Sequence, residues 1–282
     1  MNILSIQSHV AYGHVGNSAA VFALQRLGCE VWPVNTVQFS NHPGYGAWRG
    51  SVVPPDLIRE VVSGIADRGV LAACDGVLSG YVGAPETAHV VLGAVGEVKR
   101  ANGGALYCCD PVIGDAGPGV YVQADIPAFM REQAVPLCDV VTPNQFELDY
   151  LSGRGTPTLA AALGAIDVLH ALGPGVVLVT SLDTEETPDD AVDLVASDAA
   201  GRFRLRTPKL PLAVNGAGDA IAAMFFLHYL RTRSARAALS RAASSLFGIL
   251  RRTADAGSRE LLLIDAQDEI VTPSRHFTAD PL

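Results

Sequence analysis

Short apolar runs alternate with helix-compatible stretches along most of this chain, about 30 residues apart, which is the spacing of βα units. The expected strands lie near residues 2–8, 30–36, 75–80, 105–110, 138–142 and 175–180. The expected helices between them lie near 16–27, 55–67, 85–101, 125–134 and 158–172. This alternation predicts right-handed βαβ units and a mostly parallel central sheet. Several strands are apolar throughout, which indicates that helices cover both faces of the sheet.

The pattern changes near the last third of the chain. Residues 193–196 and 202–205 flank a polar turn and predict an antiparallel hairpin at one edge of the sheet. Two more helices are expected, near 217–231 and 234–252. No internal repeat is present, and no linker-like stretch is long enough to separate two domains. The sequence therefore predicts a single α/β domain over residues 1–282.

The composition excludes several classes of protein. The apolar fraction of 49% is ample for a buried core, while a formal net charge of −9 argues against nucleic acid and anionic membrane surfaces as partners. No basic stretch precedes an apolar one at the N-terminus, so a secretory signal is not expected. Polar residues interrupt the apolar segment 211–230, which favours a core helix over a membrane span. Five cysteines without a C-x-x-C pair are expected to be buried and reduced, as in a cytoplasmic protein.

A glycine-rich turn, Gly216-Ala217-Gly218-Asp219, stands between a strand-like end and the apolar run 220–230. Glycines allow a tight turn and a close approach to a ligand, and the start of the following helix offers free N–H groups to a phosphate. A carboxylate beside a phosphate is unexpected, because like charges repel. Asp219 is explained if it accepts the proton of a hydroxyl that attacks the phosphorus. On these residues alone, a capped helix start explains the turn equally well.

Six further blocks follow one another along the chain, at residues 6–14, 35–42, 78–81, 110–114, 142–147 and 180–181. Together with the Gly216–Asp219 turn, they resemble the pattern of the pyridoxal kinase family, which belongs to the ribokinase-like superfamily. The resemblance runs in the right order from Ile3 to about Ile249. It implies ATP-dependent transfer of a phosphate to the 5′-hydroxymethyl group of pyridoxal and related vitamers. It also implies Mg²⁺, K⁺ as a candidate activating ion, and a homodimer.

The resemblance assigns roles to individual residues. Asp219 is the catalytic base, and backbone N–H groups of Gly216, Ala217 and Gly218 form the anion hole. The nucleotide-side residues are Asp110, Thr142, Asn144, Glu147, Thr180 and Ser181. The vitamer-side residues are Ser8, Thr36, His42 and Tyr81. Six of these residues fall at or just past the expected end of a strand, which is where ligands bind in such sheets: Ser8, Thr36, Tyr81, Asp110, Thr142 and Thr180.

Asp110 and Glu147 are the expected Mg²⁺ ligands, because this ion prefers oxygen and needs only one or two carboxylates beside substrate phosphates. Asp110 could instead fix the turn at Pro111, and Glu147 could be an ordinary acid in the first turn of a helix. Residues 113–124 hold three glycines and a proline and have no periodic apolar face. We expect them to form a structureless flap over both substrates. A merely variable surface connection is the alternative.

Two other functions remain open from the sequence. A kinase of hydroxymethylpyrimidine, a smaller heteroaromatic alcohol, is the alternative enzyme. A vitamer-binding protein that has lost its kinase activity is the alternative of another class, and an intact Asp219 argues against it. One departure from the wider superfamily concerns the anion hole: Ala213, Val214 and Asn215 precede it, where many ribokinase-like proteins carry a threonine.

Overall fold

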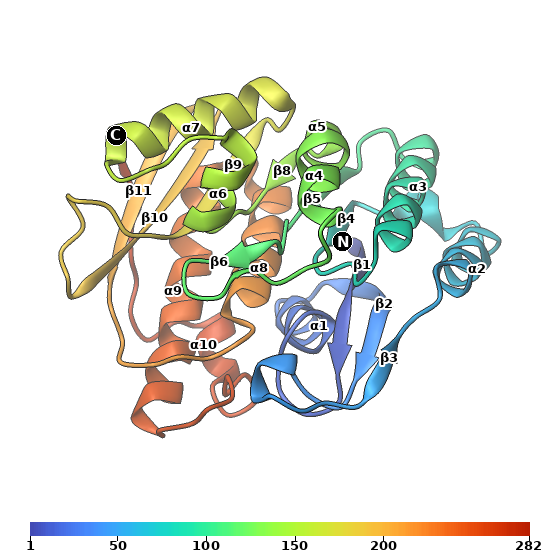
Figure 1. Ribbon diagram of the computed structural model, residues 1–282, viewed down its shortest axis with the longest axis horizontal. Helices are drawn as coiled ribbons and strands as arrows, with labels where there is room; N and C mark the ends of the chain where they lie inside the picture. The colour runs from blue at the N-terminus through green and yellow to red at the C-terminus, as the bar shows by residue number, and fades with distance from the viewer.

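The computed structural model describes residues 1–282 and contains one ten-stranded sheet (Figure 1). Its strands are β1 (Asn2–Val10), β2 (Glu30–Phe39), β3 (Gly50–Val52), β4 (Gly76–Ser79), β5 (Leu106–Cys109), β8 (Val140–Val141), β9 (Val176–Leu182), β10 (Ala191–Asp198), β11 (Gly201–Pro208) and β12 (Asp280–Pro281). The strand order is β12-β11-β10-β9-β8-β5-β4-β1-β2-β3. The strands from β9 to β2 in this order run parallel, whereas β3, β10, β11 and β12 pair antiparallel with their neighbours. The sheet is therefore mostly parallel in its centre and antiparallel at both edges.

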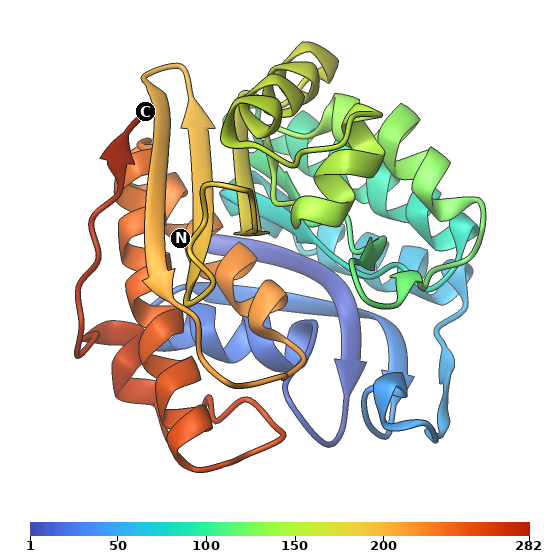
Figure 2. The same cartoon turned by 60° about the vertical axis from the view of Figure 1, so that its left-hand side comes forward.

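Helices cover both faces of the sheet (Figure 2). The main helices are α1 (Asn17–Arg26), α2 (Pro55–Ala66), α3 (Pro85–Ala101), α4 (Ile126–Phe129), α5 (Val135–Leu137), α6 (Gln145–Ser152), α7 (Leu159–Leu172), α8 (Ala217–Thr232), α9 (Ala235–Asp255) and α10 (Gln267–Val271). Two buried clusters of 36 residues each lie on the two faces. Neighbouring residues of β1 point to opposite faces, so Ile3 belongs to the cluster with α1, α8 and α9, and Leu4 to the cluster with α2, α3 and α7.

The predicted strands and helices are all present, and the predicted fold class is confirmed. The hairpin is β10–β11, but it is not the outermost pair, because β12 adds to β11. The expected strands and helices did not include β3, α6, α10 or β12, although one interpretation of Glu147 implied a helix start at α6. Each of these elements has eight residues or fewer, which is too short for a hydrophobic period to be recognised.

The prediction of a structureless stretch at 113–124 is wrong in part. Two short strands, β6 (Gly114–Asp115) and β7 (Gly119–Val120), form a small antiparallel sheet there. A Cβ on Gly114 would collide with the carbonyl oxygen of Gly119, and Gly119 itself has a left-handed φ of 71°. Glycines that indicated disorder in the sequence instead allow the two strands to approach closely. Strands of two residues have no periodicity that a sequence could reveal.

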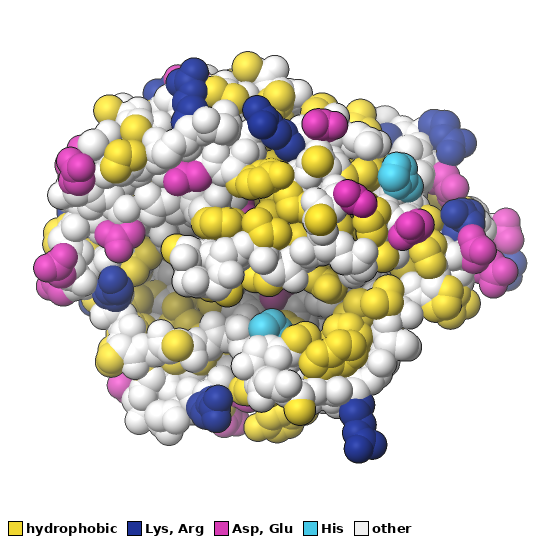
Figure 3. Space-filling view, in the orientation of Figure 1, with side chains coloured by type: hydrophobic (Ala, Val, Ile, Leu, Met, Phe, Trp, Pro, Cys, Tyr) yellow, Lys and Arg dark blue, Asp and Glu magenta, His cyan; other side chains and the backbone are white.

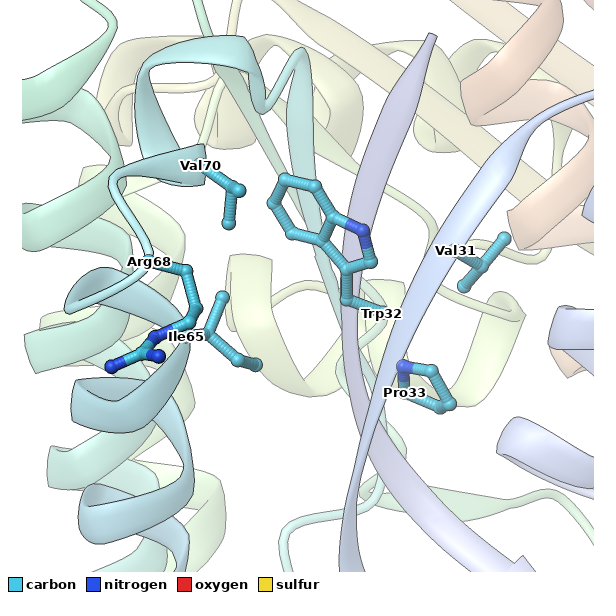
Figure 4. Close-up of a pocket in the computed structure, with 6 residues that line it drawn as sticks. All are labelled: Val31, Trp32, Pro33, Ile65, Arg68 and Val70. Atoms are coloured by element: carbon cyan, nitrogen blue, oxygen red, sulfur yellow. The ribbon is translucent and has the colours of Figure 1, made fainter.

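The carboxyl ends and the amino ends of the parallel strands carry different features. The predicted site residues lie toward the carboxyl ends of the strands, where the loops to α6 and α8 begin. A shallow hollow of about 330 Å³ lies near the amino end of β2 (Figure 4), and its lining residues are Val31, Trp32, Pro33, Ile65, Arg68 and Val70. None of the predicted site residues lines this hollow. None of the helices has the length and apolar character that crossing a membrane requires.

Candidate active site

The glycine-rich turn forms the beginning of α8. Gly216 caps the helix with a left-handed φ of 88°, and a Cβ at this position would collide with the carbonyl oxygen of His14. Only glycine fits here, because the turn is left-handed and the loop after β1 packs directly against it. The first N–H groups of α8 have no intrahelical partner and point out of the helix with the positive end of its dipole. The turn therefore has the geometry of a helix start with free N–H groups, and anion binding at this turn stays a prediction.

Asp219 lies in the first turn of α8 and is a half-buried residue. Burial raises the pKa of this carboxyl group, although hydrogen bonds from the backbone of Gly16 and of Asp219 itself oppose the increase. Gly16 has a φ of 53°, and a Cβ on it would collide with Ser8. The loop after β1 thus brings Ser8 and Asp219 close to one another through a single glycine.

Asp110 is a buried carboxylate that follows β5. Thr142, which follows the neighbouring strand β8, donates a hydrogen bond of 2.9 Å from Oγ1 to Oδ1 of Asp110. Burial raises the pKa of Asp110 well above its usual range, and repulsion from Glu147 and from Asp219 adds to this increase. The three carboxylates therefore lie close enough to interact, and none of them forms an ion pair with a protein cation.

Glu147 and Asn144 form a capping box at the start of α6. Asn144 Oδ1 accepts from the Glu147 N–H at 2.9 Å, and Glu147 Oε2 accepts from the Asn144 N–H at 3.0 Å. The other carboxylate oxygen, Oε1, accepts from the N–H of Ile113 at 2.7 Å. Burial raises the pKa of Glu147 to about 7. Glu147 is thus a helix-start acid, as the alternative interpretation had it, and it also fixes the base of the flap.

The flap has a second link to the same helix. Asn144 Nδ2 donates to the carbonyl oxygen of Gly114 at 2.8 Å. The N-x-x-E element therefore holds both Ile113 and Gly114 beside Asp110. Val112, which lies between Asp110 and Ile113 in the sequence, has a φ of 45°. This value is unusual for a β-branched residue and indicates backbone strain at this turn.

The donor set suits a hard divalent cation. No group of three or more histidine, cysteine or acidic side chains is placed to hold a metal ion by itself. Mg²⁺ does not need such a group, since it keeps several waters and binds through one or two carboxylates together with substrate phosphates. Asp110 and Glu147 are buried and lack a cation partner, which is the environment in which a bound cation would relieve their mutual repulsion.

A cavity of about 630 Å³ extends from this region toward α9. Its volume lies within the range of small-molecule and cofactor sites. Thr180, Ser181, Ala217 and Gly218 line one part, and the remaining wall is largely apolar, including Val192, Leu194, Leu212, Leu246 and Phe247. Figure 3 shows a cleft that crosses this face of the molecule, with an acidic side chain visible inside it. The polar end of this cavity can accommodate phosphates, and its apolar wall can accommodate a nucleobase.

Thr180 and Ser181 lie within β9 and not beyond its end, because this strand continues to Leu182. Thr180 is buried, and its N–H donates to the carbonyl oxygen of Pro143 at 2.9 Å. Ser181 is exposed and has a left-handed φ of 51°. The strand is therefore distorted at the point where both residues reach the cavity.

The vitamer-side residues lie on β1 and β2 or in the loops that follow β2 and β4. Ser8 and Thr36 also lie inside their strands, since β1 continues to Val10 and β2 to Phe39. Thr36 is completely buried, and its hydroxyl donates to the carbonyl oxygen of Tyr81 at 2.6 Å. The hydroxyl oxygen of Thr36 can still accept a hydrogen bond, but its proton is already used.

Tyr81 and His42 are both half-buried. Tyr81 packs against a small apolar cluster formed by Val10, Val15, Val37 and Phe39. His42 precedes a short 3₁₀ turn, Pro43–Tyr45, and its Nδ1 accepts from the N–H of Gly44 at 3.1 Å. Burial lowers the pKa of His42, so the ring is neutral at physiological pH.

Tyr121 is a flap residue that the sequence did not single out. Burial raises the pKa of its hydroxyl, and repulsion from Glu147, Asp110 and Asp219 adds to the increase. The hydroxyl is therefore neutral and within range of the charges of the three carboxylates, while the residue as a whole is 51% exposed. An isolated tyrosine within a glycine-rich loop gives no spacing signal. Lys209 and Arg259, which line the cavity, were also missed.

All five cysteines are buried and free of disulfides, as expected from the sequence. Cys108 and Cys109 lie in β5 immediately before Asp110. Burial raises the pKa of both thiols, to about 12 for Cys109. Neither thiol is a reactive nucleophile at neutral pH.

The chain is similar to known proteins over most of its length. The phosphomethylpyrimidine kinase family model matches residues 23–262. The pyridoxal kinase PdxY of Granulibacter bethesdensis is 54% identical over 283 residues, covering 99% of each chain. The pyridoxal kinase PdxY of Rubrobacter xylanophilus is 55% identical over 278 residues, covering 98% of this chain and 96% of the relative.

A solved structure gives the same result at lower sequence identity. The pyridoxal kinase from Leishmania donovani, in complex with ADP and pyridoxamine, superimposes with a TM-score of 0.91 at 30% identity. The match covers 100% of this chain and 99% of that one. Since the similarity extends over the full length at about half identity to the bacterial relatives, the chain belongs to the pyridoxal kinase family, within the group that the phosphomethylpyrimidine kinase model describes.

Proposed function

We propose that this protein transfers the γ-phosphate of ATP to the 5′-hydroxymethyl oxygen of pyridoxal and related vitamers. The observation that carries the proposal is Asp219 at the start of α8, where a proton acceptor adjoins an anion-binding turn and a cavity of nucleotide size. The solved relative from Leishmania donovani, which is in complex with ADP and pyridoxamine, supports both substrates.

Asp219 is the general base in this proposal. Its carboxylate takes the proton of the hydroxymethyl group while that oxygen forms a bond to the γ-phosphorus and the bond to the ADP oxygen breaks. The raised pKa of Asp219 makes it a better proton acceptor than an ordinary aspartate. The backbone N–H groups of Gly216, Ala217 and Gly218 stabilise the negative charge of the transferred group.

The nucleotide occupies the large cavity. Thr180 and Ser181 contact its phosphates from β9, with Thr142 and Asn144 nearby on the loop after β8. Asp110 and Glu147 would hold Mg²⁺, directly or through water. When bound, this ion would neutralise the phosphate charge beside the two carboxylates. K⁺ is a candidate second cation, on the family resemblance alone.

The vitamer occupies the space between β1, β2 and α8. Ser8 is placed to bond the ring nitrogen, and His42 and Tyr81 would line the ring. Because the proton of Thr36 is used by Tyr81, Thr36 would accept from the phenolic group and would also fix Tyr81. The flap residue Tyr121 would close the site over the carboxylates and exclude water.

The organisation of the protein is part of the same proposal. The single large sheet, shared by both ends of the chain, supports one domain over residues 1–282. The resemblance supports a homodimer, and the five buried free cysteines are consistent with the cytoplasm.

A second candidate function is phosphorylation of a methylpyrimidine, which the name of the matching family model favours. One assay separates the candidates. The purified protein with Mg²⁺ and ATP is given pyridoxal, hydroxymethylpyrimidine or neither, and ADP formation and the phosphorylated product are measured. We expect the highest kcat/KM for pyridoxal. A preference for hydroxymethylpyrimidine would replace the proposed substrate, and no ADP formation in any of the three reactions would indicate a lapsed kinase.

A further inference from the structure

The segment that follows α9 returns to the active-site edge and contacts two loops there. Leu261 and Leu263 are completely buried and anchor the segment in the core. Ser258 fixes the backbone of Glu260 twice: its hydroxyl accepts from the N–H at 3.1 Å and donates to the carbonyl oxygen at 2.7 Å. The side chain of Glu260 is therefore held on a rigid support.

The Glu260 carboxylate joins the two loops. Its Oε1 accepts a hydrogen bond from the hydroxyl of Tyr45, at the end of the short turn that begins after His42. Its Oε2 lies against Gly13, where an added Cβ would overlap the carboxylate. Gly13 has a φ of 94°, so glycine is needed there both for the turn and for the space.

Both loops carry vitamer-side elements of the proposed function. The first loop, residues 11–16, contains Gly13 and ends at Gly16, which packs against Ser8. The second loop, residues 42–46, carries His42 and reaches the glycine-rich turn, since a Cβ on Gly44 would contact Asn215. Two loops that are separate in sequence are thus tied to one carboxylate outside the proposed reacting centre.

Arg259 also contacts Tyr45. Its guanidinium lies 5.4 Å from the centroid of the Tyr45 ring, which is within the range of a cation–π interaction. Arg259 and Tyr45 also line the large cavity. The position of Tyr45 is therefore set by both a hydrogen bond and a stacked cation.

We propose that Glu260 is a positioning residue, which holds loops 11–16 and 42–46 in the arrangement that binds the vitamer. The inference rests on the proposed function only for its kinetic part. The loop anchoring itself follows from the contacts of Glu260 with Tyr45 and Gly13.

The experiment compares Glu260→Ala, Glu260→Gln and Tyr45→Phe with the parent protein. Glutamine has the same shape and can accept the Tyr45 hydroxyl, so Glu260→Gln should behave like the parent. Glu260→Ala and Tyr45→Phe should raise the KM for pyridoxal by roughly 2- to 13-fold, the worth of one net hydrogen bond, with a smaller change in kcat. Glu30→Ala is the charge-matched control, because Glu30 is exposed at the start of β2, at the opposite edge.

Hydrogen exchange gives a readout that does not depend on activity. Glu260→Ala should speed exchange in both loops, and Tyr45→Phe should do so only in loop 42–46, because it leaves the carboxylate against Gly13. Unchanged exchange in both loops of Glu260→Ala, or an unchanged KM for pyridoxal in an active and folded variant, would overturn the inference. Failure of the parent to phosphorylate pyridoxal, with the exchange pattern as expected, would instead count against the proposed function.

Discussion

The large cavity at the carboxyl ends of the strands and the smaller hollow at their amino ends have very different surroundings. The larger one is lined by Asp115, by Gly218, which precedes Asp219, and by Ser181, which has a strained φ of 51°. Asp110, Glu147 and Asp219, three carboxylates without a protein cation, lie on neighbouring loops and helix starts, together with Val112, which has a φ of 45°. The smaller one, around Trp32 and Ile65, contains no acidic side chain. Its nearest left-handed residue is a glycine, Gly69, which adopts this conformation without strain.

This difference shows what distinguishes a working site from a surface irregularity. Burying a carboxylate without a partner is unfavourable, and a β-branched residue at positive φ is strained by about 1–3 kcal/mol. A fold keeps such features where a ligand or a reaction compensates for them. The smaller hollow has no such feature, so its shape alone gives no reason to assign it a role.

The largest effect is expected at Asp219. Replacement by asparagine keeps the shape and the hydrogen-bond acceptor but removes the base, so kcat should fall by about 10²- to 10⁴-fold. Steady-state kinetics at saturating Mg²⁺, ATP and pyridoxal would measure this. Nucleotide binding and thermal stability should remain close to those of the parent protein.

The pH profile of the parent protein is the check on this assignment. Burial raises the pKa of Asp219, so the base becomes protonated at a higher pH than an ordinary aspartate. Activity should therefore be lost as the pH falls through that raised value, and kcat/KM should be constant above it. A kcat of Asp219→Asn equal to that of the parent would show that another group accepts the proton.

The sequence predicted the fold well because its information is local and repeated. Each parallel strand is an apolar run with a helix on either side, and the helix start at Gly216 has a glycine signal. The contacts that define the site are not local. Nothing in the sequence indicates that Thr36 donates to Tyr81, that Tyr121 approaches the carboxylates, or that Glu260 reaches Gly13 and Tyr45. Those contacts depend on how loops far apart in the chain meet at one edge of the sheet.

The second effect concerns Glu147. Glutamine keeps one acceptor oxygen but loses the charge, so the Mg²⁺ concentration for half-maximal rate should rise by about 10- to 100-fold, as for other groups that orient a metal. Mg²⁺ titration of the ATP-dependent rate would measure this. Asp149→Asn is a suitable control, because Asp149 lies on the same helix and bonds Thr156 rather than the flap.

Glu147→Gln should also weaken the fold. A single amide oxygen cannot accept from both Asn144 and Ile113, so one buried N–H loses its partner, at a cost of about 1–3 kcal/mol. If only stability changes and the Mg²⁺ dependence does not, Glu147 is a structural residue and Asp110 alone remains as the acidic metal candidate.

A smaller effect is expected at Thr36. Valine has the same shape but cannot accept from the phenolic group of pyridoxal or donate to Tyr81. The preference for pyridoxal over hydroxymethylpyrimidine should narrow by roughly 2- to 13-fold, the value of one hydrogen bond of 0.5–1.5 kcal/mol. The ratio of the two kcat/KM values measures this. An unchanged ratio with an equal loss for both substrates would assign Thr36 to the support of Tyr81 alone.

The flap should respond to nucleotide only in its outer part. Ile113 and Gly114 are already bonded to Glu147 and Asn144, and residues 119–121 are bonded to the 113–115 segment, whereas residues 116–118 form the turn between β6 and β7. Hydrogen exchange with and without an ATP analogue should therefore show new protection at the tip, residues 116–118, and little change at the base. Equal protection of the tip in both states would make the loop a static connection instead of a lid.

The smallest effect is expected at the amino ends of the strands, away from the active site. Arg68 lines the smaller hollow and is exposed, and it forms no ion pair with an acidic side chain. Arg68→Ala removes one positive charge, as Arg259→Ala would at the active-site edge, yet it should leave kcat and both KM values unchanged. Surface substitutions of this kind usually alter stability by less than about 0.5 kcal/mol. Kinetics and thermal unfolding of Arg68→Ala and Arg259→Ala, measured together, test this comparison. A loss of activity in Arg68→Ala would mean that the smaller hollow affects the active site. Backbone strain and unpaired charge would then not be sufficient to identify every functional surface of this fold.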